Sequence, residues 1–294
     1  MAMADLSRRA VVAVVALLVV LPVIYRGGWL MGVLAAALAM LATREFCLLA
    51  RRTGVRPFTR TAMAITAALV LAATAEPFFT GFAPLALTVV VGATVMLFVA
   101  AVRARTVTDK PLASVCSTLT ATLYVGGGLC FAVLLRHLPE TGAAVRTAGP
   151  LEGPLLLLFP LTVTWVGDIA AYFAGSLWGN RRLFPAVSPG KTLEGTIAGI
   201  LAAGAAGLFF ATAAAEPFVL LGVEPGWLIG IALLIGAGGL AGDLAVSLLK
   251  REAGVKDTGS MLPGHGGVLD RLDAVLVTLP LGYAALQLAG AVSP

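Results

Sequence analysis

Nine long apolar stretches, separated by short polar loops, constrain this chain more than any other feature of its sequence. The stretches cover residues 10–25, 28–43, 61–75, 78–102, 112–135, 154–175, 193–215, 227–249 and 268–288. Most of them approach the roughly 20 residues that a helix needs to cross a bilayer. With 59% hydrophobic and only 12% charged residues, the chain also lies outside the range of soluble domains. The sequence therefore predicts an all-α, polytopic integral membrane protein with about nine transmembrane helices.

The basic residues are distributed unevenly between alternate loops. Of the 20 Lys and Arg residues, all but Arg26, Arg136 and Arg146 fall in one set of loops. Because cytoplasmic loops retain Lys and Arg, this set is predicted to be cytoplasmic, with the N-terminus inside and the C-terminus outside. The arginine-rich loop over residues 44–60 is interpreted as such a retention signal against anionic headgroups, with no catalytic role. We therefore expect a multi-pass protein of the inner cell membrane whose net charge does not indicate a nucleic-acid partner.

The apolar stretches are not interrupted by a charge-rich linker or a polar domain, so we expect one membrane domain over residues 1–294. Polarity is nevertheless uneven within it. The first five stretches hold almost no ionisable residue, whereas from Asp168 onward charge, Gly and Pro gather on the predicted cytoplasmic side. Residues 1–152 are therefore interpreted as an N-terminal scaffold half and residues 153–294 as a C-terminal catalytic half.

Two glycine pairs predict where membrane helices approach each other. Gly195 with Gly199, and Gly238 with Gly242, are each four residues apart within an apolar stretch. Residues at this spacing lie on one face of a helix, and glycine lets two backbones come close there. We expect close helix packing at both pairs.

Two polar motifs lie at predicted cytoplasmic ends. Asp168 and Tyr172 are four residues apart, so they share one helix face. The second motif, SPGKTLEG over residues 188–195, is typical of a turn that leads into a helix. Its backbone amides and Lys191 form a candidate anion site, while Glu194 would cap the helix start or orient Lys191.

The most charged segment is GDLAVSLLKREAGVKDTGSMLPGHGGVLDRLD, residues 242–273. The residues that share one helix face near its start are Asp243, Ser247, Lys250 and Arg251. Near its end, Asp270 and Asp273 lie three residues apart, with Arg271 between them. Because a charge costs about 2.5 to 3.5 kcal/mol at the centre of a membrane helix, such a cluster requires a functional explanation.

Separated aspartates beside several Lys and Arg residues are what phosphoryl chemistry requires. Carboxylate oxygens bind Mg²⁺, and fixed positive charges bind a pyrophosphate group. The LPGHGG loop adds flexible backbone amides that can approach a ligand. Zinc is disfavoured because His265 has no Cys or second His beside it, and a hydrolase triad is disfavoured because the sequence has no nucleophile elbow. Mutual pairing of charges at a membrane edge would explain any one pair, but not the whole set with its glycines.

The segment SLLKREAGVKDTGSMLPGHGGVLDRLD, residues 247–273, closely resembles the C-terminal signature of the phosphatidate cytidylyltransferases, also called CDP-diacylglycerol synthases. The upstream GDL, SPGKTLEG and DIAAY motifs are similar to further family elements, so the resemblance covers residues 160–290. It implies transfer of CMP from CTP to phosphatidic acid, giving CDP-diacylglycerol and pyrophosphate for phospholipid biosynthesis. The attacking lipid phosphate has a second pKa of about 6, so at neutral pH it is largely an anion and needs little help from a base.

The resemblance also implies roles for individual residues. The implied Mg²⁺ ligands are Asp243 and Asp270, with Asp273 as an additional ligand or as a residue that orients the ligands; a second metal ion is left open. The implied phosphate-holding cations are Lys250, Arg251, Lys256 and Arg271, of which Lys250 and Arg271 join Asp243 and Asp270 as catalytic residues. The other implied substrate-binding residues are Ser188, Lys191, Ser247, His265, Gly266 and Gly267. Asp168 and Asp257 would be structural partners of these groups.

The implied partners are CTP, phosphatidic acid and membrane lipid, and a homodimer is left open. The active site would be a polar funnel that faces the cytoplasm and has a lateral gap for lipid. A CTP-dependent lipid kinase of the dolichol or phytol type is an alternative, since it combines similar substrates but transfers the γ-phosphoryl group. An ion-coupled transporter that uses Asp168, Asp243 and Asp270 is a less favoured alternative, because these acids lie near the ends of the stretches and no inverted repeat is evident.

Overall fold

The computed structural model describes residues 18–138, 150–261 and 266–292 of the chain. Within these residues, seven helical segments are long and apolar enough to cross a membrane. They are α2 (Gly28–Arg52), α4 (Phe79–Ala104), the segment Val107–Arg136, α8 (Glu152–Trp178), α9 (Leu193–Ala213), α11 (Pro225–Glu252) and the segment Leu269–Val292. The chain is thus a mostly helical, multi-pass membrane protein, as predicted.

Two of the nine predicted stretches are not among these seven segments. The third stretch forms α3 (Thr59–Ala75), which is apolar but has only 17 residues. The first stretch is described only from residue 18, and it is helical over residues 18–26. The count of nine and the orientation of the two termini therefore stay predictions.

The helices and loops group into two compact units. Unit 1 contains residues 1–133 and 252–272, and unit 2 contains residues 134–251 and 273–294. The charged segment over residues 242–273 therefore contributes to both units, and its loop after α11 packs with the N-terminal helices of unit 1. The predicted division into scaffold and catalytic halves concerns function and stays a prediction.

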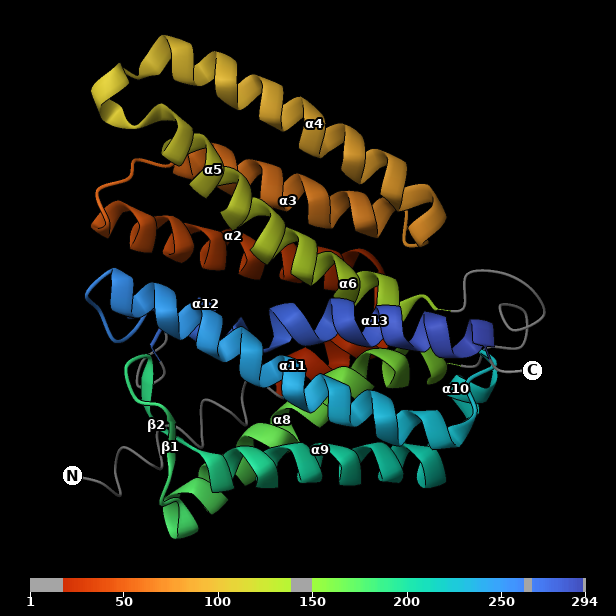
Figure 1. The fold of residues 1–294 in the computed structure, drawn as a ribbon. Coiled ribbons are helices and arrows are strands. Elements are labelled where there is room, and N and C mark those ends of the chain that lie inside the picture. Colours follow the sequence, from red (N-terminus) through yellow and green to blue (C-terminus); the bar gives the residue numbers. More distant parts are fainter. Residues whose placement is uncertain (1–17, 139–149, 262–265, 293–294) are drawn as a thin grey trace. The chain divides into compact units, whose positions relative to one another are not determined.

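In unit 1, α2 packs along α3, α3 packs on α4, and α4 contacts α5 (Pro111–Ala121), as Figure 1 shows. A π-helical turn, η2 (Thr122–Gly127), continues α5 into α6 (Gly128–Arg136). The side chains buried between these helices include many small ones, which allows close packing. The short helix α12 (Leu269–Leu272) contacts α2.

The connection from α4 to α5 follows from its sequence. Thr106 and Asp109 form a capping box around the short 3-10 helix η1 (Val107–Asp109). Pro111 then takes the first position of α5, where its missing N–H removes no helical hydrogen bond. These two features fix where η1 and α5 begin.

Unit 2 is built around α8, α9, α11 and α13 (Val275–Val292), with the short helix α10 (Glu216–Val219) at one end (Figure 1). Both predicted glycine pairs lie at close helix contacts. A Cβ at Gly199 would come within 2.9 Å of the Gly167 carbonyl oxygen on α8. A Cβ at Gly242 would come within 2.5 Å of the Asp273 carbonyl oxygen. Glycine at these positions therefore lets α9 approach α8, and lets α11 approach the start of α13.

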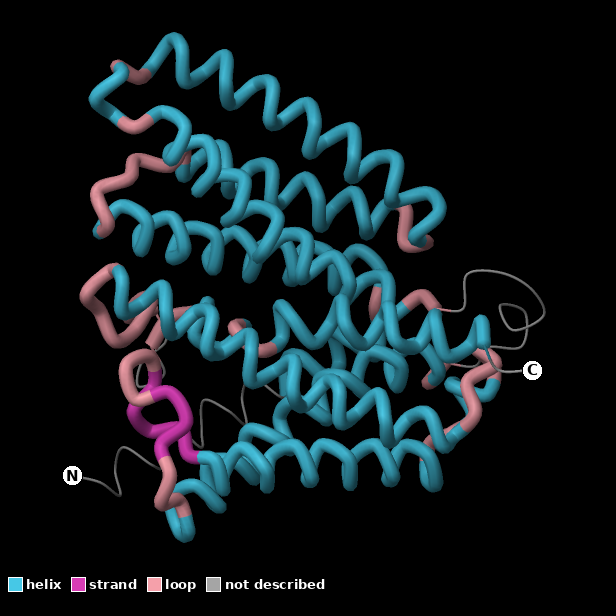
Figure 2. The backbone as a smooth tube through the Cα atoms, viewed as in Figure 1, coloured by secondary structure: helices cyan, strands magenta, loops and turns pink. Residues whose placement is uncertain are grey.

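A β-hairpin connects α8 to α9, and Figure 2 shows it in magenta. Strand β1 (Arg182–Phe184) pairs antiparallel with β2 (Ser188–Thr192), with Arg182 opposite Thr192. The sequence predicted only a turn that leads into a helix here, which is incomplete: β2 is a strand that runs directly into α9. Pro189 and Gly190 disfavour helix in this segment, and two strands this short leave almost no periodic pattern in the sequence.

Candidate functional site

A carboxylate cluster in unit 2 gathers residues from four parts of the sequence. We define it as Asp168 of α8, Lys191 of β2, Asp243 and Lys250 of α11, and Asp273 directly before α13. The Nζ atom of Lys191 is 2.6 Å from Oδ2 of Asp243, and the two form an ion pair. Four separate backbone elements thus bring their charges to one place.

The acids of the carboxylate cluster repel one another. Asp273 interacts electrostatically with Asp168 and Asp243, and also with Lys250. Asp168 in turn interacts with Asp243 and Lys191. With three carboxylates against two ammonium groups, the ionised cluster carries an excess of negative charge. Such an arrangement favours a bound cation.

The predicted helix face on α11 is confirmed by its contacts. Ser247 donates a hydrogen bond of 3.2 Å from Oγ to Oδ1 of Asp243, one turn away. At the end of the same helix, Nε of Arg251 donates to the Val187 carbonyl oxygen at 3.0 Å. Arg251 therefore holds the hairpin turn next to α11, so that Ser188 and Lys191 lie at the same end of unit 2 as the cluster.

The start of α9 is fixed by two side chains. Thr192 is the N-cap, and its hydroxyl accepts a hydrogen bond of 3.2 Å from the Gly195 amide. The Glu194 carboxylate reaches back to the hairpin and accepts from the amides of Asn180 at 3.1 Å and Arg181 at 3.2 Å. Lys191 is thus oriented by Asp243, and the predicted alternative in which Glu194 orients it is wrong.

Unit 1 contains a second polar arrangement, centred on a buried glutamate. The Glu45 side chain lies on α2, and the residue is only 3% exposed. Its Oε1 accepts from the Val268 amide at 3.1 Å, and its Oε2 accepts from the Leu269 amide at 2.8 Å. The Thr258 hydroxyl lies 2.9 Å from Oε2 as a further donor. A residue of the second helix of the chain therefore fixes a loop more than two hundred positions away in sequence.

Asp270 completes this arrangement, which we call the signature clamp: Glu45, Thr258, Gly267, Val268, Leu269 and Asp270. Oδ2 of Asp270 accepts from the amides of Thr258 at 2.8 Å and Gly267 at 3.0 Å. The Thr258 hydroxyl lies 3.0 Å from the same oxygen. A hydrogen bond to a charged group contributes about 1.5 to 3 kcal/mol, so these contacts hold the loop firmly.

Two glycines shape the signature clamp. Gly266 has φ of +77°, which favours glycine. A Cβ at Gly267 would collide with the Thr258 hydroxyl and the Glu45 carboxylate. The Gly267 amide, which the resemblance assigned to substrate, donates here to Asp270.

Glu45 was not among the site residues predicted from the sequence. Its signal was present, since an acid stands within an apolar run, ATREFCLLA, where an unpaired charge would be costly. The neighbouring arginines masked that signal, because they made the segment resemble an ordinary retention loop. Nothing in the sequence indicated which distant backbone amides the carboxylate would contact.

The remaining predicted residues are distributed as follows. Lys256 and Asp257 are exposed in the loop after α11, and Arg271 is exposed on α12. His265 lies outside the described residues. Asp270 packs in unit 1, whereas Asp243 and Asp273 pack in unit 2.

The implied Mg²⁺ would need oxygen ligands from several side chains. Across residues 18–138, 150–261 and 266–292, no three His, Cys, Asp or Glu side chains are gathered as a ready metal cage. The donors of the carboxylate cluster are nevertheless carboxylate and hydroxyl oxygens, which suit Mg²⁺. The chemistry of this donor set therefore fits a hard divalent cation.

One protein family and one relative match this chain over nearly its whole length, and further relatives match about half of it. The sequence model of the cytidylyltransferase family matches residues 7–289. The phosphatidate cytidylyltransferase of Synechocystis sp. is 32% identical over 295 residues, covering 94% of this chain and 95% of the relative. The phosphatidate cytidylyltransferase of Bacillus subtilis is 35% identical over 168 residues, covering 57% of this chain and 56% of the relative. That of Haemophilus influenzae is 40% identical over 143 residues, or 46% of each chain.

Proposed function

This chain belongs to the cytidylyltransferase family, and we propose that it transfers CMP from CTP to phosphatidic acid, giving CDP-diacylglycerol and pyrophosphate. The observation that carries this proposal is the alignment with the Synechocystis phosphatidate cytidylyltransferase over 94% of the chain. The carboxylate cluster is built from the segments that resemble this family, and the signature clamp combines the last of these segments with Glu45 of α2.

The reaction determines what the residues must do. A phosphate oxygen of phosphatidic acid attacks the α-phosphorus of CTP, and the bond from this phosphorus to the oxygen that bridges to the β-phosphate breaks. Pyrophosphate leaves with that oxygen. Both reactants are anions, so the main requirement is positive charge that screens their repulsion and stabilises the leaving group. A strong general base is not required, because the lipid phosphate is already largely ionised.

We propose that Asp243 and Asp270 bind Mg²⁺, with Asp273 as an additional ligand or an orienting residue. Bound there, Mg²⁺ would neutralise charge on the phosphates of CTP. The Ser247 hydroxyl, which donates to Asp243, orients one of these carboxylates. The repulsion between the Asp243 and Asp273 carboxylates supports cation binding there, because a bound cation would relieve it.

The cations would hold the phosphate groups. The position of Lys191 supports this role for the cations, because its ion pair with Asp243 places an ammonium group beside a proposed metal ligand. The other residues proposed to contact substrate phosphates are Lys250, Arg251, Lys256, Arg271, Ser188, His265, Gly266 and Gly267. The hydrogen bond from Arg251 to the hairpin supports a joint site for Arg251 and Ser188.

The proposed location is the inner cell membrane, with the active site facing the cytoplasm, where CTP is found. The proposed topology has nine helices and a cytoplasmic N-terminus. The distribution of Lys and Arg residues between alternate loops supports this orientation. A homodimer stays a prediction.

The test is a product analysis with the purified full-length protein in detergent, supplied with CTP, phosphatidic acid and a series of divalent metals. We expect CDP-diacylglycerol and pyrophosphate in equal amounts, and only when a suitable metal is present. CDP with a phosphorylated lipid alcohol would instead identify a CTP-dependent kinase. Failure to turn over in detergent, combined with ion-driven uptake in sealed vesicles, would identify a transporter.

A further inference from the structure

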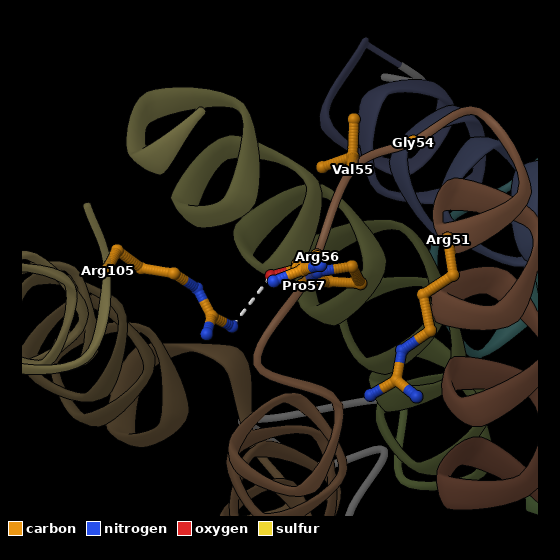
Figure 3. Close-up of a pocket in the computed structure, with 6 residues that line it drawn as sticks. All are labelled: Arg51, Gly54, Val55, Arg56, Pro57 and Arg105. Atoms are coloured by element: carbon orange, nitrogen blue, oxygen red, sulfur yellow. Dashed lines mark hydrogen bonds between the residues drawn. The ribbon is translucent and has the colours of Figure 1, made fainter. Parts of the chain in front are cut away.

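Unit 1 has a cavity of about 640 Å³ surrounded by arginines at the ends of its helices (Figure 3). Its lining residues are Arg51, Gly54, Val55, Arg56, Pro57 and Arg105. They come from the end of α2, the loop between α2 and α3, and the residue that ends α4. None of these residues belongs to the carboxylate cluster or the signature clamp.

Arg105 is held in a defined orientation beside the cavity. Its Nη2 donates to the Arg56 carbonyl oxygen at 3.0 Å, as the dashed line in Figure 3 shows, and its Nη1 donates to the Ala104 carbonyl oxygen at 3.3 Å. The guanidinium also lies over the Phe58 ring, 4.6 Å from the ring centroid. A guanidinium fixed in this way loses little further freedom when it binds a ligand.

The charge around the cavity is only partly compensated. Arg56 forms an ion pair with Asp109, with Nη1 and Oδ1 3.1 Å apart. Asp109 is also engaged in its capping box, where it accepts from Thr106. The Arg51 side chain makes no hydrogen bond or ion pair with any residue that the structure describes. Three guanidinium groups and one carboxylate leave a positive excess at the rim of a membrane-spanning bundle.

We propose that this arginine cavity binds the phosphate group of an anionic membrane phospholipid, at a site separate from the reaction. Guanidinium groups match phosphate oxygens with paired hydrogen bonds. Val55 and Pro57 supply an apolar wall, and the ends of membrane helices lie at headgroup depth. Basic pockets between membrane helices are typical sites for anionic headgroups. The loop that the sequence indicated as a general retention signal thus forms a specific binding site.

Arg51 lies between the arginine cavity and the loop that contains Thr258 of the signature clamp. It also lines a neighbouring cavity of about 600 Å³, together with Asp257, Thr258 and Gly259. Both cavities belong to unit 1. A lipid phosphate at Arg51 would therefore lie near the loop that contains Asp257, Thr258 and Gly259.

The test measures lipid binding by native mass spectrometry of the delipidated full-length protein in an uncharged detergent. Three probes are added in separate arms: phosphatidylglycerol, phosphatidylcholine and inorganic phosphate. One basic residue near an anionic surface contributes about fivefold in binding, so Arg51→Gln should bind phosphatidylglycerol about fivefold more weakly and Arg51→Gln/Arg105→Gln about twenty-five-fold. The matched control is Arg103→Gln, an exposed arginine in the last turn of α4 that does not line the cavity. Its binding should stay within about twofold of the wild type.

Three outcomes would overturn the proposal. In the first, the double variant binds phosphatidylglycerol as tightly as the wild type. In the second, Arg103→Gln weakens phosphatidylglycerol binding as much as Arg51→Gln does, which would indicate attraction by diffuse surface charge. Inorganic phosphate could bind with the same arginine dependence while the lipid does not, which would assign the site to a soluble anion. If the double variant does not fold, Arg51→Gln alone decides, because Arg51 is exposed. The assay contains no CTP, so its failure is distinguishable from a failure of the proposed transferase activity.

Discussion

The two units of this protein hold their acidic residues in opposite ways. In the signature clamp of unit 1, the Glu45 and Asp270 carboxylates accept hydrogen bonds from backbone amides and a hydroxyl. In the carboxylate cluster of unit 2, Asp168, Asp243 and Asp273 repel one another beside two lysines. In the first arrangement the carboxylates fix a loop through hydrogen bonds, and in the second the carboxylates lie close enough to repel one another.

This difference has a measurable consequence for substitution of an acid by its amide. In the signature clamp, the substitution places an NH₂ group against buried donors and should lower stability. In the carboxylate cluster, it removes repulsion and should leave stability nearly unchanged while it removes activity. The following predictions test this contrast, beginning with the largest effect.

Removal of divalent metal should have the largest effect. We expect a chelator to reduce CDP-diacylglycerol formation to background and excess Mg²⁺ to restore it. Mg²⁺ should also stabilise the wild type against unfolding, by about 1.4 kcal/mol at ten times its dissociation constant. A thermal melt in detergent with and without Mg²⁺ measures this second effect, and full turnover in the presence of the chelator would contradict the prediction.

Asp243→Asn should reduce turnover by about 10³-fold, since it removes a proposed metal ligand. Its free energy of unfolding without metal should stay within about 1 kcal/mol of the wild type, because loss of the Lys191 ion pair is offset by relief of repulsion. The stabilisation by Mg²⁺ should be lost with the activity. Glu252→Gln, an exposed acid at the end of the same helix, is the control and should keep normal turnover. Substantial turnover of Asp243→Asn at saturating Mg²⁺ would remove this residue from the metal site.

Glu45→Gln should lower the free energy of unfolding by about 2 to 4 kcal/mol, because the new amide group faces the buried donors of Val268 and Leu269. Turnover should fall as well, because the loop that carries Asp270 loses its anchor. Denaturation in detergent measures the first effect, and Glu76→Gln, an exposed acid in the same unit, should leave stability unchanged. Wild-type stability of Glu45→Gln would show that the signature clamp does not depend on negative charge.

Asp168→Asn should have the smallest effect on stability. In the absence of divalent metal, we expect it to stabilise the protein by about 0.5 kcal/mol, because one of three mutually repelling acids is removed. The measurement is the same denaturation experiment in chelator. A clear loss of stability would mean that attraction between Asp168 and Lys191 outweighs the repulsion.

Much of the fold was predictable because apolar stretches and glycine spacing report directly on membrane helices. The sequence predicted a helix from Leu193, and α9 begins at this residue. The contact between Asp243 and Ser247 followed from helical spacing alone. These features depend on neighbours within a few residues, which the sequence displays.

The features that escaped prediction depend on contacts distant in sequence. The hydrogen bond from the Leu269 amide to Glu45 joins positions 224 residues apart, and no local pattern encodes it. The β-hairpin was missed because Pro189 and Gly190 indicate a turn more strongly than a strand. Electrostatic contact of Asp168 with Asp243 likewise required the packing of α8.

The Thr258 hydroxyl has one proton but two carboxylate oxygens within hydrogen-bond distance, Glu45 Oε2 at 2.9 Å and Asp270 Oδ2 at 3.0 Å. A hydroxyl donates to one acceptor at a time, so one of the two oxygens is a reserve partner. If Asp270 turned toward a cation, the Thr258 hydroxyl would still have Glu45 as its acceptor, whereas the amides of Thr258 and Gly267 would lose Oδ2 of Asp270. The shared hydroxyl therefore lowers the free-energy cost of such a change, and the two amides set what remains of that cost.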